Sequence, residues 1–397
     1  MLKQLKQYQE RLLKKHNIRY HRYIFKEIDF DDKMIAIFGA RGVGKTTTLF
    51  QYLVELQANK KKVLYISLDY PFLAGADLIE IVEAFVEEGG EYLLLDEVHR
   101  YHDFSAYLKT IYDLFEIKVL FTSSSATSLL NAKSDLSRRV TLYNLYGFSF
   151  REFLELKYSV TLESLKLEEI FENHTTISKK IVKEKFDILT AFKEYLKVGY
   201  YPFFFDKKTS YFQNLVNTIN LTIDLDLTSL GLIEQKYTYK LKKLLEVVCE
   251  SSPFEVNYSK IATASEISRA KLYDYVTFLA DGQMLLLIDE PIKGVKKIAV
   301  PAKIYLNNTN LLYAYCQNAK IGTIRETFFA NQVSQKSQLH ISKEGDFTID
   351  KKYRVEIGGK NKSFKQIKDV ENSYVVSDEI ESGSGAKIPL WLFGFLY

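Results

Sequence analysis

Little in this sequence favours flexible linkers or insertion into a membrane. Six prolines and 18 glycines in 397 residues leave little room for long disordered segments. No apolar run approaches the roughly 20 residues that a membrane-spanning helix needs. The first residues, MLKQLKQYQERLLKKH, are charged throughout and lack the apolar core of a signal peptide. We therefore expect a cytoplasmic protein that does not enter a membrane.

Cysteine is also scarce. The two cysteines, Cys249 and Cys316, lie far apart in the sequence and outside any spacing typical of metal ligands. In a cytoplasmic protein we expect both of them to be reduced, buried thiols.

Neither sign of charge dominates, since a net charge of +4 in 397 residues is no evidence for nucleic acid by itself. The basic residues are concentrated in residues 1–30, which hold eight Lys or Arg against three Asp or Glu. Two interpretations of this stretch stand: the solvated face of an amphipathic helix, or a surface arm that touches phosphates or a partner.

The composition that remains is that of a soluble protein with a sizeable core. Hydrophobic residues make up 47% of the chain and charged residues 26%. Because 397 residues exceed one typical domain, the length predicts two to four domains.

The strongest motif lies in residues 34–53, MIAIFGARGVGKTTTLFQYL. A short apolar strand is expected before the pattern G-x-x-x-x-G-K-[ST] and a helix after it, as in a phosphate-binding loop. The glycines allow a tight turn whose N–H groups point at phosphate oxygens, and the helix N-terminus adds positive potential. We expect Lys45 to reach the β- and γ-phosphates and the Thr46 hydroxyl to bind Mg²⁺. The candidate nucleotide-binding residues are Gly39, Ala40, Arg41, Gly42, Val43, Gly44, Lys45, Thr46 and Thr47.

Acidic and hydroxyl side chains follow two later strands. In EYLLLDEVHRYHDF the apolar strand expected at residues 92–95 ends in Asp96, a candidate Mg²⁺ ligand, and Glu97, a candidate base that polarises the attacking water. The strand expected at residues 118–123 places Thr122 where a polar side chain would sense the γ-phosphate.

Helical patterns separate these strands, which predicts the order β-α-β-α-β-α-β. We therefore expect an α/β fold with a doubly wound parallel sheet and the nucleotide at the carboxyl ends of its strands. After this core come Arg138 and Arg139. Two interpretations of this pair stand equally. One arginine is an arginine finger, which raises the rate by a factor on the order of 10³–10⁵, or the two are a surface pair or part of a salt bridge.

Residues 34–154 resemble the bacterial and archaeal AAA-type P-loop ATPases that carry a C-terminal, restriction-endonuclease-like domain of undetermined function. The resemblance rests on GARGVGKTTTL, YISLDYP, LLLDEVHRYHDF, LFTSSSATSLL, LSRRVTLYNLYGFSFREFL and, at residues 192–204, FKEYLKVGYYPFF. It implies binding of ATP and Mg²⁺ through Gly39–Thr46, Asp96 and Glu97, with Arg139 as the counterpart of the family's arginine. Relatives often have glycine at the positions of Ser123 and Arg138.

The rest of the chain divides into three expected parts after an N-terminal helix and ATPase core at residues 1–157. Residues 158–235 are helical by pattern and suit a lid over the nucleotide. Residues 236–305 predict three helices and a strand pair that turns near Gly294, the order of a winged helix. We weigh two roles for this part: contact with DNA, and packing against the ATPase.

Residues 306–397 predict a nuclease-like α+β domain. Glu326 on a helix, Asp346 at the start of a strand, Glu356 on the next strand and Lys360 just beyond it follow the order of a Mg²⁺-dependent nuclease site. Alternation along the strand puts residue 358 on the face of Glu356, and this residue is glycine instead of lysine. We therefore expect a domain with a nuclease-like fold and favour the interpretation that it does not cleave nucleic acid.

The sequence as a whole predicts an AAA-type ATPase that hydrolyses ATP with Mg²⁺ and couples this to a winged-helix and nuclease-like part. One alternative is a DNA-processing or defence nuclease gated by ATP. Another is a nucleotide-dependent switch that binds a protein partner. Oligomerisation is compatible with each of these.

Overall fold

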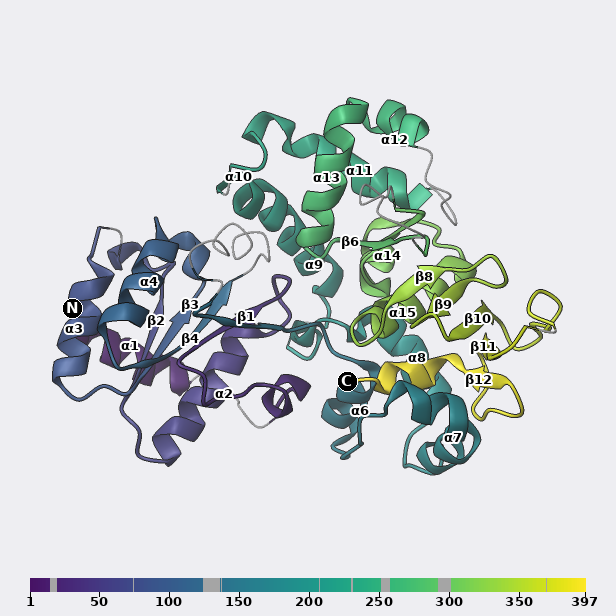
Figure 1. Ribbon diagram of the computed structural model, residues 1–397, viewed down its shortest axis with the longest axis horizontal. Coiled ribbons are helices and arrows are strands. Elements are labelled where there is room, and N and C mark those ends of the chain that lie inside the picture. The colour runs from purple at the N-terminus through teal and green to yellow at the C-terminus, as the bar shows by residue number, and fades with distance from the viewer. Residues whose placement is uncertain are drawn as a thin grey trace. The chain divides into compact units, whose positions relative to one another are not determined.

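The structure, a computed structural model, describes residues 1–14, 20–73, 75–123, 136, 138–206, 208–229, 231–250, 258–291, 301–368 and 370–397. These form two compact units, residues 1–146 and residues 147–397 (Figure 1). The turn expected near Gly294 lies outside the described residues. No helix in the described ranges combines the length and the hydropathy that crossing a bilayer requires.

A parallel five-stranded sheet forms the centre of the first unit, in the order β2-β3-β4-β1-β5. Its strands are β1 (Met34–Phe38), β2 (Val63–Ser67), β3 (Tyr92–Asp96), β4 (Lys118–Ser123) and β5 (Thr141–Asn144). Among its described helices are α1 (Leu2–Leu13), α2 (Lys45–Ala58), α3 (Leu78–Glu87) and α4 (Phe104–Leu114). The predicted parallel α/β sheet is therefore confirmed, with β5 as an additional strand that the sequence patterns did not predict.

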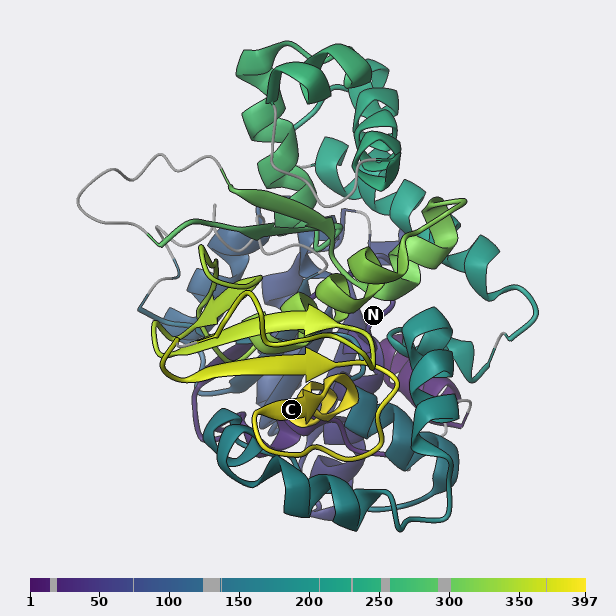
Figure 2. The same cartoon turned by 90° about the vertical axis from the view of Figure 1, so that its right-hand side faces the viewer.

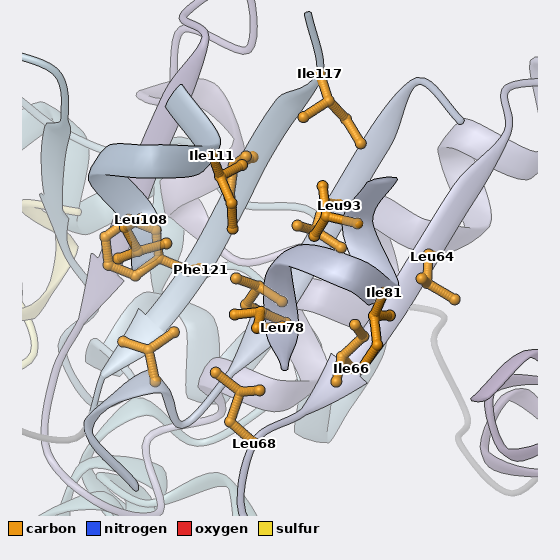
Figure 3. Packing of buried hydrophobic residues seen from close by; sticks show 14 of the residues in the cluster. Leu64, Ile66, Leu68, Leu78, Ile81, Leu93, Leu108, Ile111, Ile117 and Phe121 are labelled. Atoms are coloured by element: carbon orange, nitrogen blue, oxygen red, sulfur yellow. The ribbon is translucent and has the colours of Figure 1, made fainter. Parts of the chain in front are cut away.

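Strands β1, β2 and β3 are mostly apolar and mostly buried, as is typical of parallel strands covered on both faces. Figure 3 shows part of the resulting core, in which strand side chains meet those of α3 and α4. The residues labelled there include Leu64, Ile66, Leu93, Phe121, Ile81 and Ile111.

Helix α1 covers the edge of the sheet at β2. The Gln9 side chain is buried and pairs with the β2 backbone: its Oε1 accepts from the Tyr65 N–H at 2.7 Å, and its Nε2 donates to the Val63 carbonyl at 3.4 Å. An edge strand otherwise exposes such groups to other chains. One face of the basic N-terminal helix is thus structural.

The second unit begins with helices and continues with three helices and a strand pair. The first group is α6 (Phe150–Tyr158), α7 (Leu167–Ile181), α8 (Ile188–Glu194) with a π-helical turn at Tyr195–Gly199, α9 (Tyr211–Leu221), a π-helical turn at Thr222–Asp226 and α10 (Leu227–Ser229). The second group is α11 (Thr238–Glu250), α12 (Tyr258–Ser265), α13 (Arg269–Asp281) and the antiparallel strands β6 (Leu285–Ile288) and β7 (Lys303–Leu306).

A second, mixed sheet completes this unit after α14 (Thr309–Tyr315) and α15 (Ile321–Ser334). Its strands are β8 (Leu339–Ile341), β9 (Phe347–Ile349), β10 (Tyr353–Gly358), β11 (Ser373–Ser377) and β12 (Lys387–Pro389). The order is β12-β11-β10-β9-β8, with parallel pairing from β10 to β12 and antiparallel pairing from β8 to β10. Figure 2 shows the yellow strands of this sheet side by side.

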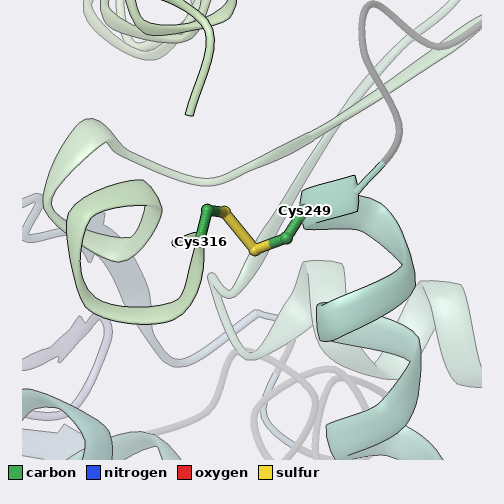
Figure 4. Close-up of a disulfide and its surroundings, with 2 residues drawn as sticks. All are labelled: Cys249 and Cys316. Carbon is green, nitrogen blue, oxygen red and sulfur yellow. A yellow bond between two sulfur atoms is a disulfide. The ribbon is translucent and has the colours of Figure 1, made fainter. Parts of the chain in front are cut away.

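The two cysteines form a disulfide in this unit, which corrects the prediction of reduced, buried thiols. Cys249 near the end of α11 is bonded to Cys316 just after α14, with 5.3 Å between the Cα atoms (Figure 4). Both residues are only half-buried. The prediction failed because 67 positions separate the cysteines in the sequence, and only the packing of α11 beside α14 brings them together.

The amide of Asn310, on α14, joins several helical segments of the second unit. Its Nδ2 donates to the carbonyls of Tyr195 at 3.1 Å and Leu196 at 3.0 Å, and its Oδ1 accepts from the Tyr200 N–H at 2.8 Å and the Tyr211 hydroxyl at 2.5 Å. The side chain is fully buried. All four of its hydrogen-bonding positions are therefore used.

We expect Asn310→Asp to lower the free energy of unfolding of the second unit by about 3 kcal/mol. The substitution replaces the buried Nδ2 amide group, which donates to two carbonyls, by a carboxylate oxygen that faces the same carbonyls and cannot donate. Thermal unfolding followed by circular dichroism measures this. The exposed Asn217 of α9 supplies the matched control, and Asn217→Asp should leave the midpoint nearly unchanged. Equal midpoints for the two variants would contradict the role given to Asn310.

Candidate functional site

The loop between β1 and α2 depends on three glycines. Gly42 and Gly44 adopt φ angles of 87° and 102°, which favour glycine. A Cβ atom on Gly39 would lie 2.2 Å from the Leu145 carbonyl oxygen, so only glycine fits there. Lys45 begins α2, is buried, and its Nζ donates to the carbonyls of Gly39 at 2.9 Å and Ala40 at 3.1 Å. The ammonium thus lies inside the turn, as a phosphate-binding loop requires.

A buried arginine that the motifs did not reveal supports this loop. Arg22 precedes a short 3-10 turn, and its guanidinium donates to the Val43 carbonyl at 2.7 Å and the Tyr146 carbonyl at 2.8 Å. This member of the basic N-terminal stretch is therefore neither part of a solvated helix face nor part of a surface arm. No local pattern distinguishes it from the exposed basic residues around it.

The Asp96 carboxylate lies at the centre of the site. It is buried at the end of β3 and accepts hydrogen bonds from the Thr46 hydroxyl at 2.7 Å, from the Tyr65 hydroxyl at 2.9 Å and from the Thr122 hydroxyl. Burial, and then the charge of Glu97, raise the pKa of Asp96, whereas the three hydroxyls lower it. The structure thus brings together three residues that the sequence singled out, and adds Tyr65 of β2.

Glu97 follows Asp96 in a left-handed conformation, with φ of 56°. Its N–H donates to the Thr122 hydroxyl at 3.0 Å, which places the turn against the end of β4. Its Oε2 lies 3.4 Å from Nε2 of His99, a histidine whose side chain is fully buried. An L residue in this backbone conformation is strained, and such strain often occurs where a side chain must be held for function.

The hydroxyl of Thr46 and the carboxylate of Asp96 fit Mg²⁺, which prefers oxygen ligands and is often held by one or two protein groups together with water and phosphate. No group of three or more His, Cys, Asp or Glu side chains that could hold a metal ion occurs in the described part of the chain. A cation here would therefore need the oxygens of a nucleotide to complete its coordination.

Arg139 of the predicted finger is engaged with an acid of the same unit. Its Nε donates to Asp113 Oδ1 at 2.9 Å and its Nη2 to Asp113 Oδ2 at 3.1 Å, a bidentate pair with the last turn of α4. The pair lowers the pKa of Asp113. Arg138 beside it is exposed.

In the second unit, the predicted nuclease-like residues lie on α15 and β10 and just before β9 or after β10. Glu356 on β10 is 2% exposed, and among the described residues its Oε2 has no hydrogen-bond partner. Asp346 precedes β9 and accepts from the Ile357 N–H at 2.7 Å. Burial raises the pKa of Asp346 to about 6, and the charges of Glu326 and Glu356 add to this. Glu326 accepts from the Tyr305 hydroxyl at 2.6 Å and pairs with Lys303 at 3.2 Å.

Lys362, rather than Lys360, lies against Glu356. The Lys362 ammonium forms an ion pair with Glu356 Oε1, whereas the Lys360 side chain is exposed. The chain turns after β10, where the Lys362 N–H donates to the Gly359 carbonyl at 2.9 Å, and the lysine returns towards the strand. A Cβ atom on Gly358 would lie 2.6 Å from Lys362 Cγ. The glycine that departs from the nuclease pattern therefore makes room for a lysine from beyond the strand.

Two family models match parts of the chain. Residues 31–154 match a model described as AAA domain, and residues 189–320 match a domain of unknown function, DUF8612. The prediction of an AAA-type P-loop domain is confirmed for the first range. For the second range the match gives no function.

The chain is also similar to individual proteins. Uncharacterized protein MJ1637 of Methanocaldococcus jannaschii is 27% identical over 374 residues, which cover 86% of this chain and 79% of that protein. Two solved structures are similar at 16% identity: a variant of Thermotoga maritima RuvB (TM-score 0.33, 72% of this chain and 89% of that chain) and AMPPCP-bound DnaA from Aquifex aeolicus (TM-score 0.25, 65% and 84%). Structural similarity this low carries no conclusion about function.

Removing the Tyr65 hydroxyl tests the arrangement around Asp96. Tyr65→Phe deletes one donor to a buried carboxylate, so we expect the free energy of unfolding to fall by about 1.5–3 kcal/mol. Urea unfolding near neutral pH measures the change. Tyr70→Phe, in the same unit but without a hydroxyl bond to Asp96, should change stability by less than about 0.5 kcal/mol. Similar losses in both variants would argue against a special role for Tyr65.

Proposed function

We propose that the protein is an ATPase that binds ATP and Mg²⁺ at residues 39–47 and hydrolyses ATP to ADP and phosphate. One observation carries this: the Thr46 hydroxyl, next to the buried Lys45 at the start of α2, donates to the buried Asp96 carboxylate at the end of β3 at 2.7 Å. The AAA domain match covers these residues.

Each residue of the site has a distinct task in this proposal. The N–H groups of the loop and the start of α2 receive the phosphates, and Lys45 neutralises charge on the β- and γ-phosphates. Thr46 and Asp96 hold Mg²⁺, which supplies charge neutralisation at the phosphate oxygens. Thr122 fixes the Glu97 backbone and senses the γ-phosphate.

Glu97 acts as the base that takes a proton from the attacking water. Its side chain is partly exposed, unlike that of Asp96, so it remains accessible to a water molecule. His99 beside it orients the carboxylate. Arg139 is proposed to stabilise negative charge in the transition state. For this role its guanidinium must leave its ion pair with Asp113 and contact phosphate oxygens instead.

The second unit is proposed to receive the change that ATP drives. Its helices before α11 suit a lid. The elements α11–α13, β6 and β7 have the order of a winged helix, and residues 306–397 that of a nuclease-like domain. We propose these as the output parts of the protein, with DNA or a protein as the partner and with function in an oligomer.

ATP turnover by the full chain tests the main proposal. Lys45→Ala should abolish nucleotide binding, whereas Glu97→Gln should keep binding and lose on the order of 10²–10⁴ in kcat. Glu83→Gln, on the exposed face of α3, is the matched control and should leave kcat unchanged. Phosphate release and the fluorescence of a labelled ATP measure turnover and binding. Tight binding without turnover would instead favour a nucleotide-dependent switch.

A second candidate function is cleavage of nucleic acid at Asp346 and Glu356. The buried Oε2 of Glu356, which no described residue contacts by a hydrogen bond, favours it, because a buried oxygen normally has a donor or a cation beside it. The residues fit a divalent cation only in part, since Lys362 already pairs with Glu356 and the Ile357 N–H with Asp346. The candidate therefore stands second to ATP hydrolysis.

Plasmid nicking with Mg²⁺ or Mn²⁺ tests this candidate. Cleavage by the full chain should disappear in Glu356→Gln and persist in Glu381→Gln, an exposed glutamate of the same unit. Absence of nicking with either metal, with and without ATP, would remove the candidate. Cleavage that survives Glu356→Gln would point to a contaminant.

A further inference from the structure

The disulfide of the second unit forms part of the wall of a cavity of about 600 Å³. Both cysteines line this cavity, together with residues of α11, of the end of α14, of the segment that leads into α15 and of the first turn of α15. Among these are Glu246, Tyr315, Gln317, Asn318, Lys320 and Thr323. Figure 4 shows the disulfide between the end of one helix and the turn that follows the other.

This position differs from that of an inert structural disulfide. Thiol–disulfide exchange requires a thiolate to reach a sulfur atom, so access decides whether a disulfide reacts in the folded protein. Cys249 and Cys316 are each half-buried, and the cavity beside them has the volume of a typical small-molecule site. Both observations favour access of a small thiol to the bond in the folded protein.

The cavity lining indicates which thiols fit. Lys320 and Glu246 are both exposed and provide one cationic and one anionic group. Gln317 and Asn318 add side-chain amides, which both donate and accept hydrogen bonds. This set is complementary to a molecule that carries a carboxylate, an ammonium group and amide bonds.

We propose that Cys249–Cys316 is an exchange-active disulfide and that the cavity beside it binds zwitterionic low-molecular-weight thiols of peptide type. The proposal does not rest on ATP hydrolysis. It concerns a site that lies wholly within the second unit.

The reaction consists of two exchanges. The thiolate of a first small thiol attacks one sulfur of the disulfide, the S–S bond breaks, and the other cysteine leaves as a thiolate that takes up a proton. A second small thiol attacks the mixed disulfide and releases the remaining cysteine. The two cysteines gain two electrons in total, and the two small thiols leave as their disulfide.

Helix α11 has other contacts that remain after reduction. Its residues Leu241, Leu244, Leu245 and Val248 are buried, and the helix packs against α12, β7 and α14. Reduction should therefore remove the covalent link between the end of α11 and the end of α14 without unfolding the unit. We therefore expect the folded protein to reach an equilibrium between its disulfide and dithiol forms in the presence of a small thiol.

Glutathione is a suitable probe because it carries carboxylates, an ammonium group and amide bonds. The full-length protein is equilibrated in buffers of varied reduced-to-oxidised glutathione ratio, and exchange is then quenched with acid. Free thiols are labelled with maleimide, and the mass of the intact chain is measured by mass spectrometry. We expect a reversible transition between the disulfide and the dithiol without denaturant, with a mixed disulfide at intermediate ratios. Two free thiols at every ratio, or reduction only in urea, would overturn the proposal.

The charge of the cavity is tested by the rate of reduction with two thiols. Lys320→Gln should slow reduction by glutathione about two- to fivefold and leave reduction by cysteamine, which has no carboxylate, unchanged or faster. The matched control is Lys343→Gln, which should change neither rate. Lys343 is exposed between β8 and β9 and does not line the cavity. Equal rates in both variants would show that the cavity does not bind the thiol. Retained circular dichroism spectra verify that each variant is folded.

Discussion

The first unit depends on how one buried negative charge is accommodated. A carboxylate removed from water is costly unless donors surround it. Asp96 is placed at the end of β3, and its donors come from three other elements: Thr46 from α2, Tyr65 from β2 and Thr122 from β4. The start of α2, the middle of β2 and the end of β4 must therefore all lie beside the end of β3. The parallel pairing of β2, β3 and β4 supplies this alignment.

The second unit solves the same problem differently. Glu356 is also buried on an inner strand of a five-stranded sheet, yet within the described part of the chain it receives one ammonium group on Oε1 and no hydrogen bond on Oε2. Asp96 has all its donors from within the fold, whereas Glu356 retains unused capacity. A carboxylate oxygen with a free acceptor position can bind a donor or a cation of a ligand. The surroundings of Glu356 therefore remain a candidate binding site even without cleavage of nucleic acid.

The sequence predicted those parts of the site that depend on neighbours along the chain. The strand, the glycine-rich turn and the helix at residues 34–53 form one local pattern, and the apolar run before Asp96 marks the end of its strand. Tyr65, Arg22 and Lys362 could not be predicted in this way. Tyr65 reaches Asp96 across 31 positions, Arg22 reaches Val43 across 21, and Lys362 reaches Glu356 only because the chain turns back after Gly358. The short β5 lacks a long apolar run, and two of its four residues are exposed.

The bond between Cys249 and Cys316 also changes the covalent topology of the chain. It closes residues 249–316 into a ring that contains α12, α13, β6, β7 and α14. A single cut of the backbone within this ring would leave both fragments attached to one another, so the protein would keep its mass until a reductant was added. The chain before the ring and the chain after it would also remain tied at one point, whatever happens to the backbone between them.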